Sequence, residues 1–165
     1  MSNLWDDELA AVASETFETL AFMCPMGPDE TSDKSGAVSA WITFAGPFGG
    51  AIKLLVAPEM LTELATNMLG LDDESGPPTR EQQLDALKEL LNVICGNLLP
   101  RVAGSEAVFN VAAPTILADT SVPQNYASAE PAGQVGLLLD TGWAHLTAYS
   151  DQPVAQTTSA LGAGF

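Results

Sequence analysis

The sequence predicts an α+β fold, with a mainly antiparallel sheet and long helices on one face of that sheet. Residues 37–44 alternate between two sets of side chains, which is the two-residue period of a β-strand. Residues 79–99 instead place apolar side chains at helical spacing. Such segments follow one another as helix, hairpin and helix, and then as helix and strands. This order predicts two pseudo-repeated helix-hairpin halves.

The first predicted helix covers residues 4–23. Its apolar side chains recur at near-helical spacing, at Leu9, Val12, Phe17 and Leu20. We expect Pro25 to end this helix. Residues 27–35 are rich in Gly, Pro, Asp and Ser, and they predict a loop.

A hairpin and a second helix are expected next. The strand at 37–44 is followed by Gly- and Pro-rich turn residues at 46–50 and by a second strand at 51–56, which predicts an antiparallel hairpin. Pro58 stands where a proline favours the start of a helix, and Gly70 is suited to end it. The apolar face of this helix consists of Met60, Leu61, Leu64, Met68 and Leu69.

The second half opens with the longest predicted helix. An acidic linker at 71–78 leads to Thr79, and Gln82 three residues later completes the pattern of a capping box. We expect the helix to run to about Leu99, because Pro100 is a poor residue with which to continue it.

Strands and a loop are expected over most of the remaining chain. Residues 108–117 predict a strand region that Pro114 interrupts, and residues 121–133 predict an irregular loop. Strands at 135–139 and 144–149 predict a second hairpin around an Asp-Thr-Gly-Trp turn.

Length and composition are those of one folded domain. The chain has 165 residues, of which 47% are apolar, and this is enough to bury a single core. We expect one domain over residues 1–150. Residues 151–165 consist mostly of Thr, Ala, Gly and Gln without a clear pattern, and they predict a weakly ordered tail.

The charge of the chain excludes several classes of partner. Five Lys and Arg residues stand against 21 Asp and Glu residues, a formal net charge of −16. Nucleic acids and anionic membrane surfaces are bound by clustered basic residues, so we expect neither as a partner. The N-terminus is acidic where a signal peptide is basic, and no apolar run has the length of a membrane span, so we expect a cytoplasmic protein.

Few residues are suited to metal binding or nucleophilic catalysis. His145 is the only histidine, and Cys24 and Cys95 have no metal-binding spacing. We therefore expect no metal site and no cofactor that belongs to the chain itself. Both cysteines lie in apolar stretches and are expected to be buried, reduced thiols.

One face of the helix at 79–99 carries the strongest functional signal. Asp85, Glu89, Asn92 and Gly96 fall within roughly 60° of one another on a helical wheel. They point away from an apolar stripe made of Leu84, Leu87, Leu91, Ile94 and Leu98. A solvated polar face explains the carboxylates. Asn and Gly are poor helix formers, however, and a glycine on such a face favours the close approach of another molecule's backbone.

This segment resembles the phosphatase helix of the CheC/CheX family of chemotaxis phosphatases. The pattern of that family is Asp or Ser, three residues, Glu, two residues, Asn, and then about twenty-two residues to a Pro. Asp85, Glu89 and Asn92 match this pattern, and Pro114 follows after twenty-one residues, a departure of one. The expected fold of the family also matches over roughly residues 5–150.

The resemblance implies a phosphatase of the CheX branch, to which the Gly96-Asn97 pair is similar. The implied substrate is the aspartyl phosphate of a CheY-like response regulator, which supplies its own Mg²⁺. Asn92 would orient the attacking water, because an amide both accepts and donates hydrogen bonds but is no general base. Glu89 would pair with a Lys beside the partner's phosphorylation site. Asp85, Gly96 and Asn97 would contact the partner.

Two other functions stay open at this point. The same face could dock a response regulator without hydrolysing its phosphate. A glycosidase could instead combine Glu15 or Glu18 with Glu89 or Asp85, provided that the two carboxylates lie about 5 to 10 Å apart in a cleft. The sequence shows no cluster of aromatic residues of the kind that binds sugars.

The predicted repeat implies a second, inactive site. If the halves share a fold, Glu15 and Glu18 are the counterparts of Glu89 and Asn92. A carboxylate in place of the amide would repel a phosphoryl group and could not donate a hydrogen bond to it.

The resemblance also allows a homodimer. CheX-like proteins can continue a sheet across two subunits, and the strand at 144–149 is a candidate for such an edge.

Overall fold

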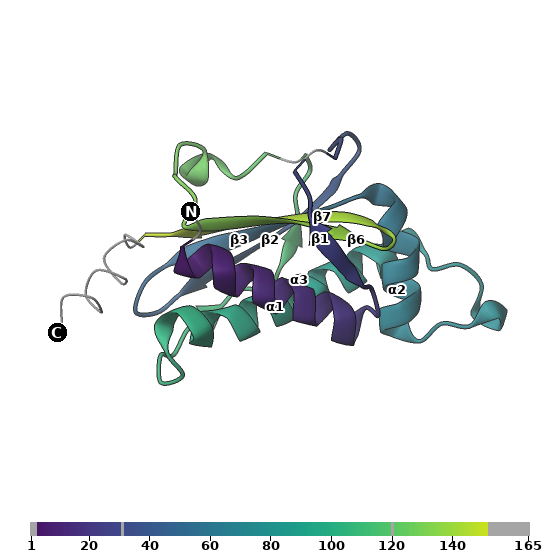
Figure 1. Ribbon diagram of the computed structural model, residues 1–165, viewed down its shortest axis with the longest axis horizontal. Coiled ribbons are helices and arrows are strands. Elements are labelled where there is room, and N and C mark those ends of the chain that lie inside the picture. Colours follow the sequence, from purple (N-terminus) through teal and green to yellow (C-terminus); the bar gives the residue numbers. More distant parts are fainter. Residues whose placement is uncertain (1–2, 31, 120, 152–165) are drawn as a thin grey trace.

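The computed structural model describes residues 3–30, 32–119 and 121–151. In this part of the chain a seven-stranded antiparallel sheet carries three α-helices on one face (Figure 1), which confirms the predicted α+β class. The helices are α1 (Leu4–Leu20), α2 (Leu61–Leu69) and α3 (Arg80–Ala103), with 3₁₀ turns η1 (Pro58–Met60), η2 (Asp73–Ser75) and η3 (Gln124–Tyr126). The strands are β1 (Pro25–Pro28), β2 (Val38–Ala45), β3 (Gly50–Val56), β4 (Asn110–Val111), β5 (Thr115–Ile116), β6 (Gly133–Leu139) and β7 (Gly142–Ser150).

Two hairpins meet in the middle of the sheet. β2 and β3 form the first, from Val38 opposite Val56 to Phe44 opposite Gly50. β6 and β7 form the second, and β3 pairs with β7 to join them. The resulting order is β1-β6-β7-β3-β2-β4, with β5 also paired to β2. A helix precedes each hairpin, α1 before the first and α3 before the second, as the predicted repeat requires.

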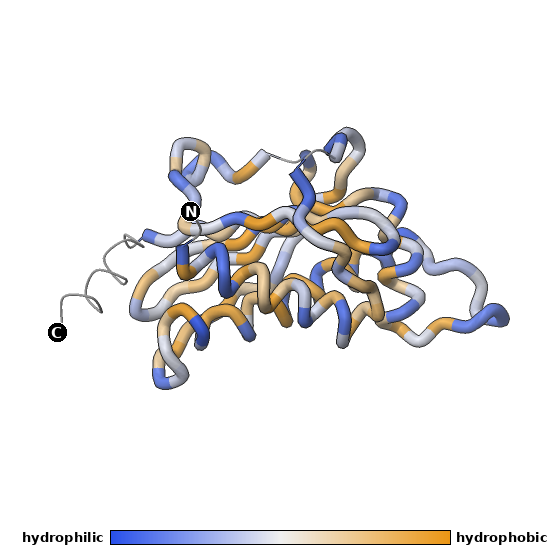
Figure 2. Tube along the Cα trace, viewed as in Figure 1, coloured by the Kyte–Doolittle hydropathy of each residue, from blue (hydrophilic) through white to orange (hydrophobic). Residues whose placement is uncertain are grey.

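The core lies between the helices and the sheet. α1 and α3 pack against each other on this face, and α2 packs against α3 (Figure 1). Apolar residues gather on the inner side of both layers, while the loops and the outer side of the helices are more polar (Figure 2). Fully buried members of this core include Leu9 and Phe17 of α1, Leu87 and Leu91 of α3, and Ile52 and Leu54 of β3.

The opposite face of the sheet is covered by loops. The loop with η3 lies there, and Tyr126 packs on Trp41 of β2 and Tyr149 of β7. Because both faces of the central strands are covered, burial does not alternate along them: β3 is buried at six of its seven positions, and β2 is buried at four consecutive positions, 39–42.

The end of the first helix differs from the prediction. α1 ends at Leu20, and the chain turns at Phe22, which has a φ of 54°. The residues that follow form the edge strand β1, paired with β6, although Pro25 was expected only to end the helix and a loop was expected from residue 27. An edge strand tolerates prolines such as Pro25 and Pro28, because one side of it needs no backbone donor.

The predicted end of the long helix at Leu99 is also wrong, because Pro100 lies inside α3. A proline in a helix removes the hydrogen bond to the carbonyl four residues earlier, here that of Gly96, and its ring crowds that carbonyl. Both residues are exposed, so water can hydrogen-bond the free carbonyl. Leu98 and Leu99 are buried and hold this turn against the core, and α3 continues to Ala103.

The strand region interrupted by Pro114 consists of two short strands on the outer edge of β2. β4 pairs at Phe44 and Ala45, and β5 pairs at Ala40 and Trp41. Residues 112–114 therefore lie opposite only two residues of β2. The extra residue bulges out of the ladder, a feature that often lies next to functional sites.

The strand at 144–149 is not a sheet edge, so a homodimer that continues the sheet through it is excluded by this pairing. β7 pairs with β3 over residues 144–150 and with β6 over residues 142–148. A strand with both sides paired has no free donors or acceptors to offer a second subunit.

Three smaller findings concern the rest of the chain. Asp151 is tied to the β2–β3 turn, since its N–H donates to the Gly49 carbonyl at 2.9 Å. The other residues of the predicted tail, 152–165, lie outside the described residues.

The two cysteines differ in their surroundings. Cys95 is buried as expected, and burial raises the pKa of its thiol to about 12. Cys24 is exposed, contrary to the prediction. None of the described helices is long and apolar enough to cross a membrane.

Candidate functional site

The helix α3 begins with the predicted capping box. The Gln82 N–H donates to Thr79 Oγ1 at 3.1 Å, and the Thr79 N–H donates to Gln82 Oε1 at 2.9 Å. These two bonds satisfy backbone donors that every helix start leaves free. The cap therefore fixes where the helix begins, and with it the direction of each side chain that follows.

The apolar side of α3 packs on the sheet and orients its polar side outward. Leu87, Leu90, Leu91 and Ile94 are fully buried. Asp85, Glu89, Asn92 and Gly96 are exposed, as the helical wheel predicts. The burial of one face thus presents two carboxylates, an amide and a glycine in one row.

A groove of about 600 Å³ runs along the first part of this row. One wall is polar and comes from α3, with the side chains Asp85, Lys88, Glu89 and Asn92. The other wall is apolar and comes from the bulged segment, with Val111, Ala112, Ala113 and Pro114. Because α3 packs against β2 and β5, the bulge between β4 and β5 lies beside it. Pro114 is far in sequence from Asp85, Glu89 and Asn92, yet it lines the same groove.

The charges in this groove are partly paired. Lys88 Nζ lies 3.3 Å from Asp85 Oδ1, one helical turn earlier. Glu89 and Asn92 are exposed and available to a molecule that enters the groove. Among the described residues, no group of three His, Cys, Asp or Glu side chains is arranged to hold a metal ion.

Two of the predicted partner contacts lie outside the groove. Gly96 is exposed one turn beyond Asn92, and apart from its two neighbours and the nearby backbone of α3 no atom lies within 4 Å of where its Cβ would be. Asn97 lines a separate groove of about 500 Å³ between α1 and α3, together with Glu15 and Arg101. The structure therefore brings Asp85, Glu89 and Asn92 together but separates Asn97 from them.

The carboxylates of the first half have different surroundings. Glu15 Oε2 pairs with Arg101 Nη2 at 3.0 Å, and Glu8 Oε2 pairs with Nη1 of the same arginine at 3.2 Å. Glu18 is exposed on α1 and is not among the residues that line either groove. Glu15 and Glu89 thus line different grooves, and the glycosidase alternative that pairs them has no common cleft.

Sequence reasoning missed Lys88 and the apolar wall. Lys88 stands three residues after Asp85 and four before Asn92, so a helical wheel places it at the margin of the polar face. No local pattern indicates that residues 111–113 lie opposite it, since that depends on the pairing of β4 and β5 with β2.

A second polar cluster lies on the face of the sheet that the loops cover. His145 Nε2 lies 2.7 Å from Asp29 Oδ2, and Ser32 Oγ donates to Asp29 Oδ1 at 2.7 Å. Burial alone would raise the pKa of Asp29, but the hydrogen bonds with His145 and Ser32 together hold it below its ordinary value. Gly136 is required here, because a Cβ at this position would collide with the Asp29 carbonyl oxygen.

Comparison with known proteins gives a family match and several structural matches. The family model described as chemotaxis phosphatase CheX matches residues 38–137, which is more than half of the chain and includes both walls of the groove. A search of curated proteins found no match.

The fold is similar to that of several solved CheX structures. CheX from Vibrio vulnificus is 18% identical, with 89% of this chain and 96% of that chain covered and a TM-score of 0.69. CheX from Desulfovibrio desulfuricans is 16% identical, with coverages of 88% and 97% and a TM-score of 0.65. CheX from Borrelia burgdorferi, in a complex with CheY, BeF₃ and Mg²⁺, is 18% identical, with coverages of 88% and 97% and a TM-score of 0.62.

Proposed function

The chain belongs to the CheX family of chemotaxis phosphatases, and we propose that it hydrolyses the aspartyl phosphate of a CheY-like response regulator at the groove between α3 and residues 111–114. The observation that carries this proposal is the meeting of Asp85, Glu89, Asn92 and Pro114 in that one groove. These are the residues of the family pattern. Pro114, separated from Asn92 by twenty-one residues, would have no reason to lie beside a polar helix face that served only solubility.

Asn92 is proposed to orient the water that attacks phosphorus. Hydrolysis of an acyl phosphate needs little covalent help, because the phosphoryl group is already activated, and catalysis then consists mainly of positioning and electrostatics. The exposed Asn92 side chain can accept a hydrogen bond from the water and donate one to a phosphoryl oxygen. It carries no charge that would repel the phosphoryl group.

Glu89 is proposed to set the register of the complex. It lies three residues before Asn92, less than one turn of α3, so a contact of its carboxylate with a lysine of the partner would fix where Asn92 points. An ion pair that forms on docking acts on affinity as well as on geometry. Gly96 and Asn97 are proposed as further contacts, at positions beyond the groove.

The Mg²⁺ of the reaction is assigned to the partner as part of the substrate. The groove offers Asp85 and Glu89 as carboxylates, but Asp85 is paired with Lys88. Mg²⁺ is usually bound by carboxylates together with the phosphate itself, and a phosphorylated regulator has both.

The experiment that tests the proposal compares two asparagines of the same helix. A panel of phosphorylated CheY-like regulators is incubated with the wild-type chain, with Asn92→Ala and with Asn97→Ala, and loss of phosphate is followed. Asn92→Ala should lose at least about a hundredfold in rate, as do other enzymes deprived of an orienting group, while it still binds the phosphorylated regulator. Asn97→Ala is the matched control: as a proposed contact it should affect binding, but at saturating regulator it should retain most of the rate.

Glu89→Lys extends the test to docking. It should weaken binding as well as turnover, because it brings two like charges together, whereas Glu18→Lys on α1 should do neither. Both glutamates are exposed, so the stability of the fold should change little. Wild-type turnover in Asn92→Ala would refute the assignment. Binding without accelerated loss of phosphate in the wild-type chain would support the non-catalytic alternative.

A further inference from the structure

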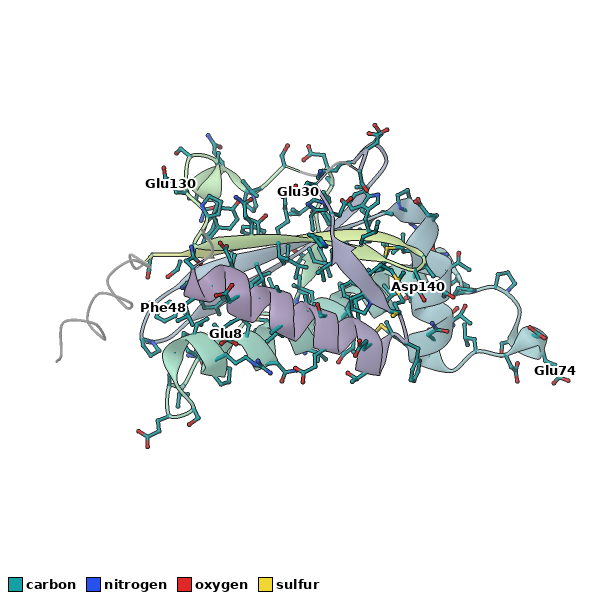
Figure 3. The ribbon with its side chains drawn as sticks, in the orientation of Figure 1. Glu8, Glu30, Phe48, Glu74, Glu130 and Asp140 are labelled. Carbon is teal, nitrogen blue, oxygen red and sulfur yellow. The ribbon has the colours of Figure 1, made fainter. Side chains whose placement is uncertain are left out.

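Lys88 is an unusual residue to find in this groove. The chain has only five Lys and Arg residues against 21 Asp and Glu. Labelled carboxylates such as Glu30, Glu74 and Glu130 lie on widely separated parts of the molecule (Figure 3). Among the described residues that line the groove, Lys88 is the one cation.

Other cations of the chain serve contacts elsewhere. Arg101 pairs with Glu8 and Glu15 and so links α3 to α1. Lys34 Nζ lies 6.0 Å from the centre of the Trp143 ring, on a loop that follows β1. Neither residue lines the groove.

The ion pair of Lys88 contributes little to stability. The Lys88 side chain is 35% exposed and that of Asp85 is 61% exposed. Pairs this open to water are screened and add little to the free energy of folding. The pair has a geometric effect instead, since it draws the flexible lysine toward the N-terminal end of α3.

This direction separates the ammonium group from the reacting atoms. Asn92 lies seven residues after Asp85, which is about 10 Å along the helix axis. An ammonium held 3.3 Å from Asp85 therefore lies near the end of the groove, away from the position at which Asn92 would meet phosphorus. It is placed to contact what surrounds the phosphorylated site rather than the phosphoryl group itself.

We infer that Lys88, oriented by Asp85, is a docking cation for the acidic rim of the partner's phosphorylation site. This inference rests on the proposed function. A site that holds Mg²⁺ beside an aspartyl phosphate carries further carboxylates, because these are the ligands that Mg²⁺ prefers. A chain with a net charge of −16 would repel such a site, and Lys88 offsets that repulsion at the point of contact. Asp85 is then a positioning residue that acts through Lys88.

The test measures the Kd for a regulator in a form that cannot turn over. The regulator that binds the wild-type chain most tightly is loaded with BeF₃⁻ and Mg²⁺, and its binding to Lys88→Met and Lys88→Arg is measured at low and high salt. Lys88→Met should raise Kd about tenfold at about 0.05 M salt, and the difference should largely disappear at about 0.5 M, where charges are screened over a few Å. Lys88→Arg should stay within about twofold of wild type, because it keeps the charge.

Lys34→Met is the matched control, since it removes the same charge from a loop outside the groove. It should leave Kd unchanged. Equal effects of Lys34→Met and Lys88→Met would overturn the inference, because net charge alone would then explain both. The inference would also be overturned if the weaker binding of Lys88→Met persisted at high salt. The same holds if Lys88→Met left Kd unchanged but lowered the rate of phosphate loss at saturating partner.

A double-mutant cycle tests the part of Asp85. Asp85→Ala should change Kd in the wild-type background but have no further effect in Lys88→Met, because its only influence is on the lysine. An equal effect in both backgrounds would mean that Asp85 contacts the partner directly, and it would overturn the positioning role. If the Lys88 and Asp85 variants do not change Kd as expected, but Asn92→Ala still loses most of its turnover, the docking inference is refuted and the proposed function stands.

Discussion

Gly96 occupies a helical position at which the fold itself has no need of a glycine. It is exposed within α3, and an added Cβ would meet nothing within 4 Å apart from its two neighbours and the nearby backbone of the helix itself. Glycine in a helix is less favourable than alanine by about 1 kcal/mol. The sequence therefore retains a destabilising residue beside Asn92, which agrees with a contact to another molecule at this point.

Replacing this glycine should separate stability from binding. Gly96→Ala should raise the free energy of unfolding by about 0.5–1 kcal/mol, because alanine loses less backbone entropy on folding. It should also weaken binding of the phosphorylated regulator, because a methyl group would stand where the partner's backbone approaches. Urea unfolding and a binding titration measure the two effects.

Gly70→Ala provides the contrast. Gly70 ends α2 with a φ of 65°, where an L residue is strained, so this change should lower stability and leave binding alone. A Gly96→Ala variant that binds as tightly as the wild-type chain would show that Gly96 lies outside the contact.

At the scale of elements, α1 and α3 are equivalent in order but not in surroundings. Each helix precedes a hairpin and shows exposed polar residues on its outer side. α3 lies beside the bulge at residues 112–114 and so forms a groove with an apolar wall. α1 instead lies beside α3, and its Glu15 forms an ion pair with Arg101.

The double variant Glu15→Ala, Glu18→Ala should therefore keep nearly all of the phosphatase activity. Carboxylates at these positions would repel a phosphoryl group, and Glu15 is already occupied by its ion pair. Stability should fall only slightly, since the Glu15 and Arg101 side chains are 63% and 40% exposed. A loss of turnover above tenfold in a folded protein would mean that the α1 helix carries a second working site.

At the scale of the whole molecule, one polar cluster fastens the loop after β1 to the sheet. Asp29 is 6% exposed, and its carboxylate joins Ser32 on the loop to His145 on β7. The Asp29 N–H also donates to the Gly136 carbonyl at 3.0 Å. These contacts hold the loop on the face of the sheet that lacks helices (Figure 1).

This cluster should make stability depend on pH. The hydrogen bonds hold the pKa of Asp29 below its ordinary value despite burial. The ionised carboxylate is therefore stabilised more in the folded state than in the unfolded state. The resulting stabilisation is fully present above about pH 4 and is lost as the pH falls through the lowered pKa. Asp29→Asn should cost about 1–3 kcal/mol at pH 7, the range for a buried group that loses charged hydrogen bonds.

Unfolding by urea at pH 7 and at about pH 3 measures this effect. The difference between wild type and Asp29→Asn should shrink at the lower pH, because Asp29 takes up a proton more readily in the unfolded state than in the folded state, where its pKa is lowered. Asp73→Asn removes the same charge from the exposed linker and should show no such dependence. A penalty for Asp29→Asn that is equal at both pH values would assign the effect to packing.

The helices, the two hairpins and the polar face of α3 could be predicted without a structure, because each depends on a pattern of neighbouring residues. The period of apolar side chains distinguishes a helix from a strand, and the capping box at Thr79 and Gln82 marks where α3 begins. Once the helix is known, its geometry alone places Asp85, Glu89 and Asn92 on one exposed side. Resemblance to a known family then added the meaning of their spacing.

Which distant segments meet depends on the complete fold and could not be predicted from any local pattern. The pairing of β4 and β5 with β2 places Pro114 in the same groove as Asn92 and Lys88. The packing of α1 on α3 forms a second groove, which Asn97 lines. The Pro-rich segment Pro25–Pro28 is a strand because it pairs with β6. The helix α3 continues beyond Pro100 because Leu98 and Leu99 are buried in the core. Local propensities are worth about 1 kcal/mol or less for most residues and about 3 kcal/mol for a proline inside a helix, whereas each buried apolar side chain is worth about 1.5–3 kcal/mol. Where the two conflict, packing between distant segments prevails, and no local pattern records it.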